Sequence, residues 1–72
     1  MTYSEAKKML MEMYPGRLYI GRKEVSTLLD LSMPTLDRRL KKDDELARIA
    51  KKERRRVLFP IPELARFLAD ES

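Results

Sequence analysis

Residues 22–42, RKEVSTLLDLSMPTLDRRLKK, predict two short helices joined by a tight turn. In the first half, Val25, Leu28 and Leu29 occupy positions i, i+3 and i+4, the spacing of one buried helix face, so we expect a helix over 22–30. Gly21 precedes this segment and can act as its N-cap. The first half therefore provides an amphipathic helix with one apolar side.

The second half predicts a turn over 30–32 and a second helix over 33–42. Ser32 is a favourable N-cap because its hydroxyl can accept a hydrogen bond from a free backbone N–H. Pro34 falls in the first turn of the helix, where its missing N–H costs nothing. Leu36 would hold this helix on the first one. The arrangement is typical of a helix-turn-helix, whose second helix enters the DNA major groove.

The outer faces of the second helix carry the candidate recognition residues. The free N–H groups and the positive dipole end at its start favour an anion such as phosphate. Arginines near the middle can form a fork on guanine N7 and O6, and lysines near the end suit backbone contacts. Lys42 fits equally well as a partner of the helix dipole. The candidates are Ser32, Thr35, Arg38, Arg39, Lys41 and Lys42.

Positive charge is concentrated in one part of the chain. Residues 38–56 hold ten Lys/Arg and four Asp/Glu, whereas the whole chain has a formal net charge of +4. Such a concentration indicates a polyanion partner. The alternative is an ordinary solvated surface of mixed charge.

A β-hairpin with a basic tip is predicted after the second helix. Ala47 and Ile49 alternate with polar neighbours, and a β-prone run follows the charged run 51–54, so we expect a hairpin over 47–59. The alternative is a helix over 44–56, since the segment begins with strong helix formers. A basic tip fits the phosphate backbone or a minor groove. The candidate wing residues are Lys51, Lys52, Arg54 and Arg55, while Arg56 is expected to lie on the inner strand and pack through its stem.

The flanking segments are expected to complete the core. Thr2 and Glu5 have the spacing of a capping box, which predicts a helix within 1–14. Met9 and Met13 lie on its apolar face, where they are either core residues or a soft partner-binding stripe. Further along the chain, we expect an edge strand over 18–20 and a closing helix over 62–70 that buries Leu64, Phe67 and Leu68.

Composition limits the possible chemistry. The chain has 72 residues, without cysteine or histidine, so we expect one small domain over 1–72. Disulfides, thiolate or imidazole metal sites and histidine-based catalysis are excluded, and a domain this small has little room for an enclosed pocket. We therefore expect no enzymatic activity, metal, cofactor or small-molecule ligand. The lack of a membrane-spanning run and of a signal peptide predicts a cytoplasmic protein, and DNA binding would make it nucleoid-associated.

The segments YIGRKEV (19–25), LLDLS (28–32), TL (35–36), RL (39–40), RRVLF (55–59) and PEL with FL (62–68) form one pattern. This pattern, over residues 18–69, resembles the phage excisionase family, which belongs to the MerR-like winged helix-turn-helix group. The resemblance implies a mainly α fold with a small β-hairpin as the wing, here with an extra N-terminal helix.

The resemblance also implies a function. Excisionases are recombination directionality factors, which bind and bend double-stranded DNA beside the arm sites of an integrase and thereby favour excision. An integrase of the same element and cooperative self-association on DNA would be the partners. Two alternatives are a small phage-type transcriptional regulator on the same fold, and a protein-interaction adaptor that uses the Met9 and Met13 face.

Overall fold

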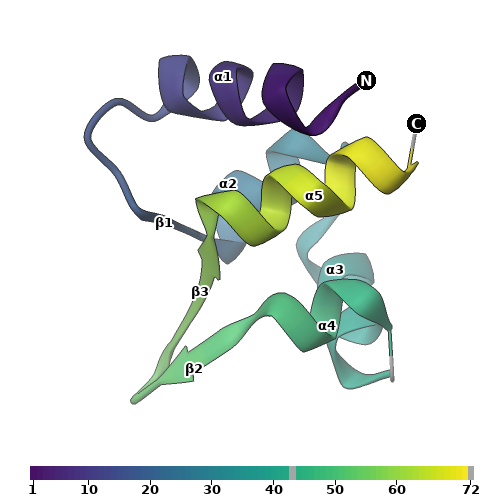
Figure 1. Cartoon of the computed structure of the whole chain (residues 1–72). Coiled ribbons are helices and arrows are strands. Elements are labelled where there is room, and N and C mark those ends of the chain that lie inside the picture. Colours follow the sequence, from purple (N-terminus) through teal and green to yellow (C-terminus); the bar gives the residue numbers. More distant parts are fainter. Residues whose placement is uncertain (43, 72) are drawn as a thin grey trace.

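The computed structural model describes residues 1–42 and 44–71; Asp43 and Ser72, which also belong to the predicted domain over 1–72, lie outside the described residues. The described residues form five helices and three strands (Figure 1). In chain order these are α1 (Tyr3–Met13), β1 (Tyr19–Gly21), α2 (Arg22–Leu28), α3 (Met33–Lys41), α4 (Glu45–Ile49), β2 (Lys51–Glu53), β3 (Arg56–Pro60) and α5 (Ile61–Glu71). Helix α1 lies along α5 on one side of the molecule, and α3, α4 and the β2–β3 hairpin lie on the opposite side.

Helix α1 begins with the predicted capping box. Thr2 Oγ1 accepts a hydrogen bond from Glu5 N at 3.1 Å, and Glu5 Oε1 accepts one from Thr2 N at 2.9 Å. The bond from the Thr2 N–H is the main cause of a lowered pKa of the Glu5 carboxyl, and the Thr2 hydroxyl adds to it, because both groups favour the charged form. The cap thus fixes where the helix starts.

The apolar face of α1 packs against α5 and covers the core. Ala6 and Leu10 are fully buried, and Met9 is half-buried against the core. Met13, at the end of the helix, is 50% exposed. Of the two interpretations, the core one is therefore right for Met9 and wrong for Met13.

Helix α2 ends at Leu28, two residues before the predicted end at 30. Asp30 takes a left-handed φ of +56°, its N–H donates to Thr27 O at 3.2 Å, and the N–H of Leu31 donates to Ser26 O at 2.8 Å. These are the two bonds of a Schellman motif, with an aspartate at the position that glycine most often occupies. The turn between the two helices is confirmed, but it spans 29–32 instead of the predicted 30–32.

Helix α3 begins as predicted and ends one residue early. Ser32 Oγ accepts from Thr35 N at 3.3 Å, which confirms Ser32 as the N-cap. The helix ends at Lys41, because Lys42 has an extended backbone with ψ of 162°. Leu36 is fully buried on the side that faces the core.

Residues 45–49 are helical, which corrects the predicted hairpin over 47–59. Asp44 caps this helix, since its Oδ1 accepts from Leu46 N at 3.2 Å. Leu46 is fully buried, and Leu46, Ile49 and Ala50 have the i, i+3, i+4 spacing of a helix. Over so few residues, the sequence fits both this helical spacing and the period-two alternation of Ala47 with Ile49, so the pattern alone does not distinguish a helix from a strand. The alternative helix over 44–56 is right only for the residues of α4, because β2 follows.

The sheet is antiparallel, in the order β1-β3-β2, and its central strand is β3. Phe59 on β3 is paired with Ile20 on β1, and both side chains are fully buried. Strand β1 is an edge strand, as predicted, but spans 19–21 instead of 18–20. Leu18 is 75% exposed, and its carbonyl accepts from Ile61 N at 3.0 Å, outside the ladder.

Helix α5 begins at Ile61, one residue before the predicted 62–70. Leu64 and Phe67 are buried and Leu68 is half-buried, as expected. No helix in the described part of the chain is long and apolar enough to cross a membrane. The described residues form a small, mainly helical fold with a three-stranded antiparallel sheet, which is consistent with a helix-turn-helix followed by a wing.

The substitution Leu10→Ala tests the packing of α1. Leu10 is fully buried, so we expect the free energy of unfolding to fall by about 2–5 kcal/mol. Urea denaturation followed by circular dichroism measures this change. The control is Met11→Ala on the neighbouring residue, which is 56% exposed and should change stability by less than about 0.5 kcal/mol. Equal losses in the two variants would contradict the packing of α1 on the core.

Candidate nucleic-acid interface

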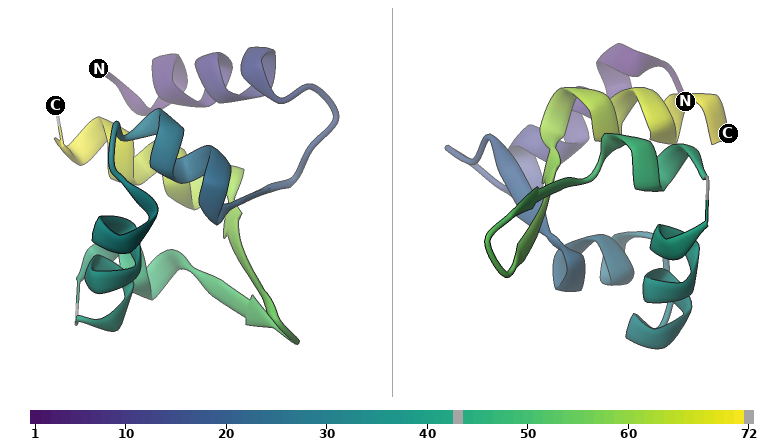
Figure 2. Two further views of the ribbon diagram at one scale, coloured as in Figure 1. Left: turned by 180° about the vertical axis from the view of Figure 1, so that it is seen from behind. Right: turned by 90° about the horizontal axis from the view of Figure 1, so that it is seen from below.

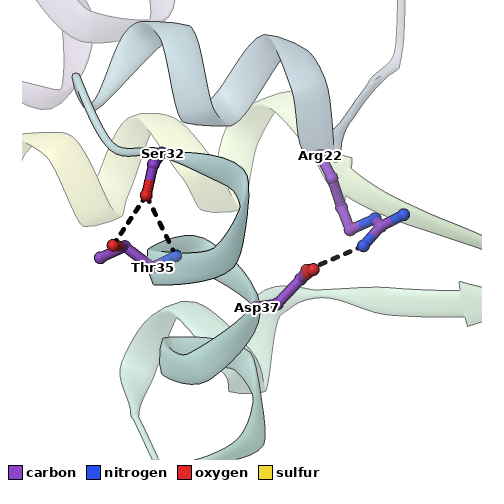
Figure 3. Close-up of polar contacts among 4 residues, drawn as sticks. All are labelled: Arg22, Ser32, Thr35 and Asp37. Carbon is purple, nitrogen blue, oxygen red and sulfur yellow. Dashed lines mark hydrogen bonds and ion pairs between the residues drawn. The ribbon is translucent and has the colours of Figure 1, made fainter.

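The start of α3 carries three linked polar side chains. Ser32 Oγ donates to Thr35 Oγ1 at 2.8 Å (Figure 3), and Arg38 Nη2 donates to the same oxygen at 3.2 Å. Thr35 Oγ1 therefore accepts twice, which leaves its own hydroxyl hydrogen available for an outside acceptor. Arg38 is exposed and keeps most of its five N–H donors toward solvent. These residues can donate hydrogen bonds to an anion or to a base edge.

Lys41 and Lys42 are exposed at the end of α3, but Arg39 is not directed outward with them. Arg39 Nε donates to Asp44 Oδ2 at 3.0 Å, and its guanidinium lies 5.8 Å from the centre of the Phe67 ring. Its side chain is only 31% exposed. The structure thus separates Arg39 from the other candidate recognition residues and places it between α3, α4 and α5.

Asp37 and Arg22 connect α3 with the start of α2. Arg22 Nη1 donates to Asp37 Oδ1 at 2.8 Å, and the two side chains are 40% and 42% exposed (Figure 3). Neither residue is among the candidates that the sequence predicts. Nothing local marks Arg22, because its partner lies 15 residues further along the chain.

The predicted wing cations lie together on the hairpin. Because Glu53 pairs with Arg56, the loop consists of the two residues Arg54 and Arg55. Lys51 and Lys52 lie on β2, and every residue from 51 to 56 is exposed. Arg56 lies on the inner strand as expected, but its exposed side chain does not pack into the core.

These cations have no carboxylate partner within the described part of the chain. The three ion pairs found there are Arg17–Glu24, Arg22–Asp37 and Arg39–Asp44. Among the described residues, the cations without an ion pair on α3, at its C-cap and on the hairpin are Arg38, Lys41, Lys42, Lys51, Lys52, Arg54, Arg55 and Arg56. Both elements project away from α1, and the views from behind and below show them at two corners of the same side (Figure 2). We call this set the basic surface.

The remaining chemistry of this side is limited. Residues 1–42 and 44–71 contain no group of three or more acidic side chains that could hold a metal ion. A groove of about 560 Å³ lies between α3, α4 and the hairpin. Chemically, this side offers positive charge and N–H and O–H donors beside a groove.

Asp44 has a lowered pKa that connects this surface to stability. The hydrogen bond from Arg39 is the main cause of the shift below 3.8, opposed by burial and aided by the N–H groups of Leu46 and Glu45. The folded state thus holds the Asp44 proton less tightly than the unfolded state does. The resulting stabilisation is complete above the ordinary pKa and is lost as the pH falls through the lowered one.

Asp44→Asn isolates this charge, because asparagine still serves as an N-cap. We expect the stability advantage of the wild type over the variant to be constant above about pH 5 and to shrink below about pH 4. Urea denaturation over that range measures the difference. A difference that does not vary with pH would contradict the role of the Arg39–Asp44 ion pair.

Comparisons of the chain with known protein families, with curated proteins and with solved structures found no match. The candidate interface is therefore defined by its own geometry: the outward face of α3, the exposed hairpin, and the cations they share.

Proposed function

We propose that this chain binds double-stranded DNA as a winged helix-turn-helix protein, with α3 in the major groove and the β2–β3 hairpin as the wing. The observation that carries the proposal is the basic surface, in which exposed and unpaired cations gather on these two elements and on one side of the fold. Clustered Lys and Arg on one face form the electrostatic footprint of a nucleic-acid-binding protein.

Within α3, the proposal assigns different tasks to different residues. Thr35 and Arg38 are spaced i and i+3, so they lie on the same face of α3, and Lys42 caps the C-terminal end of the helix. Arg38 is the candidate for base contact, since an arginine fork on guanine is the commonest specific contact in the major groove. Ser32 and Thr35 at the start of the helix, and the lysines at its end, are candidates for phosphate contacts.

The hairpin provides the second set of DNA contacts in this proposal. Its two-residue turn places Arg54 and Arg55 at the tip, which is narrow enough to follow a phosphate strand or enter a minor groove. Lys51 and Lys52 stand behind them on β2. Such contacts bind without reading bases directly, so they give affinity and orientation.

Arg39 takes a different role from the predicted one in this proposal. Its bond to Asp44 and its position over Phe67 make it a residue that holds α3 on α4 and α5. Base contact by Arg39 would require both interactions to be broken.

The resemblance to excisionases supports an architectural role for this DNA binding, in which attachment-site DNA is bent to favour excision by an integrase. A nine-residue recognition helix reads only a few base pairs, so several copies or a partner protein would supply the needed specificity. The alternative is a small transcriptional regulator with the same surface. Measuring the excision frequency of the element together with transcription separates the two roles. Only the architectural role changes the excision frequency while transcription stays the same.

Salt dependence of binding to a short duplex tests the basic surface. About five to eight phosphate contacts predict a logarithmic salt slope well steeper than about −2, and Arg54→Gln with Arg55→Gln should flatten it by about 1.8. The matched control is Lys7→Gln with Lys8→Gln on α1, which removes the same charge from the opposite side. A wild-type slope flatter than about −2, or equal effects of the two double variants, would contradict the proposal.

Arg38→Gln and Arg39→Gln should separate base contact from packing. We expect Arg38→Gln to lose about 1–3 kcal/mol of affinity for a selected sequence and to relax the preference at one base pair. Arg39→Gln should instead lower the free energy of unfolding by about 1 kcal/mol or more, since it leaves Asp44 without its partner. Sequence selection and urea denaturation of both variants provide the two readouts. Loss of sequence preference only in the Arg39 variant would reverse these assignments.

A further inference from the structure

The groove between α3, α4 and the hairpin has an apolar floor. Leu40 on α3, Ala47 and Ala50 at α4, and Val57 on β3 line it, and all four are half-buried. The groove therefore separates the two elements of the basic surface with a strip that attracts no anion by itself.

The rim of the groove is polar and mostly cationic. Lys41 on α3 and Lys52 on β2 stand on its two sides, and Arg22 and Asp37 form their ion pair at one margin. Three positive charges against one negative charge leave the rim with an excess of positive charge. An elongated anion with apolar parts would suit both the rim and the floor.

Arg22 has unused binding capacity. One of its terminal nitrogens donates to Asp37, and Figure 3 shows the other terminal nitrogen pointing away from that carboxylate. Among the residues that the structure describes, Asp37 is the acceptor that Arg22 contacts. A guanidinium carries five N–H donors in a fixed plane, so it can hold a carboxylate and a phosphate at the same time.

We infer that the groove seats one sugar–phosphate strand of the DNA, and that Arg22 is a phosphate contact which Asp37 holds in position. The inference rests on the proposed function. In a DNA duplex, one sugar–phosphate strand runs between a major groove and the next minor groove. If a helix occupies the major groove and a wing lies near the minor groove, this strand must pass between the helix and the wing. The groove occupies that place between α3 and the hairpin.

A sugar–phosphate strand matches both the apolar floor and the cationic rim of the groove. Deoxyribose presents carbon atoms that can contact the apolar floor, and the phosphates on either side can meet Arg22, Lys41 and Lys52. Arginine is suited to the phosphate at the margin because its planar fork matches phosphate oxygens. Asp37 alone would repel the strand, and its pairing with Arg22 offsets that repulsion while fixing the direction of the guanidinium.

A charge-neutral double variant distinguishes this contact from simple neutralisation of Asp37. The combination of Arg22→Gln with Asp37→Asn keeps the net charge of the wild type. If Arg22 contacts phosphate, the double variant should bind a mixed-sequence duplex roughly ten-fold more weakly, with a salt slope flatter by about 0.9. If Arg22 only neutralises Asp37, affinity and slope should equal those of the wild type, and the inference fails.

Two single variants serve as controls for the fold and for the contact. Asp37→Asn retains Arg22 and an acceptor oxygen, so we expect binding at least as tight as that of the wild type. Arg22→Lys retains the charge without the fork, so we expect the wild-type slope with weaker affinity. Circular dichroism and urea denaturation check folding of each variant. If Asp37→Asn alone weakened binding as much as the double variant does, the loss would not belong to Arg22 and the inference would be overturned. Wild-type protein that binds no DNA would overturn the proposed function as well.

Discussion

A fully buried apolar side chain in a shared core holds each of α2, α3, α4 and β3. Val25 anchors α2, Leu36 anchors α3, Leu46 anchors α4, and Phe59 anchors β3, the central strand of the sheet. The chain has no cysteine, so no disulfide assists this packing. Because apolar contacts fix the distance between α3 and the hairpin, the outward positions of both elements are free to be cationic. The proposed DNA contacts therefore depend on the apolar core, which holds α3 and the hairpin in position.

How far the sequence predicts this fold depends on how local each signal is. The caps at Thr2 and Ser32 involve bonds over three residues, and both were predictable for that reason. Helix α4 was not, because five residues cannot form a stable helix alone. It exists because Asp44 caps it, Leu46 enters the core, and Arg39 ties it to α3. Two of these three contacts depend on the folded chain.

The same distinction applies to the candidate site. The charges on α3 and the hairpin were predictable, because charge belongs to the residue and the hairpin tip was placed near the right residues. The direction of Arg39 was not, since it follows from the position of α4, which the sequence did not reveal. The pairing of Arg22 with Asp37 depends on the angle between α2 and α3 and has no counterpart in a local pattern. Sequence therefore predicts which charges are available, and the fold determines which of them face outward.

The hairpin tip is where the requirements of folding and of binding differ most. Arg54 has a φ of +59°, a left-handed conformation that costs a residue with a side chain about 1–2 kcal/mol. Lys51, Lys52, Arg55 and Arg56 add mutual repulsion, and all residues of β2 are exposed, so the core holds the hairpin only through β3. A bound polyanion would remove the repulsion, and by linkage it would stabilise the hairpin to the extent that it prefers the folded form. A tip that is unfavourable in the free protein and favourable in a complex is what we expect where binding, rather than folding, constrains the sequence.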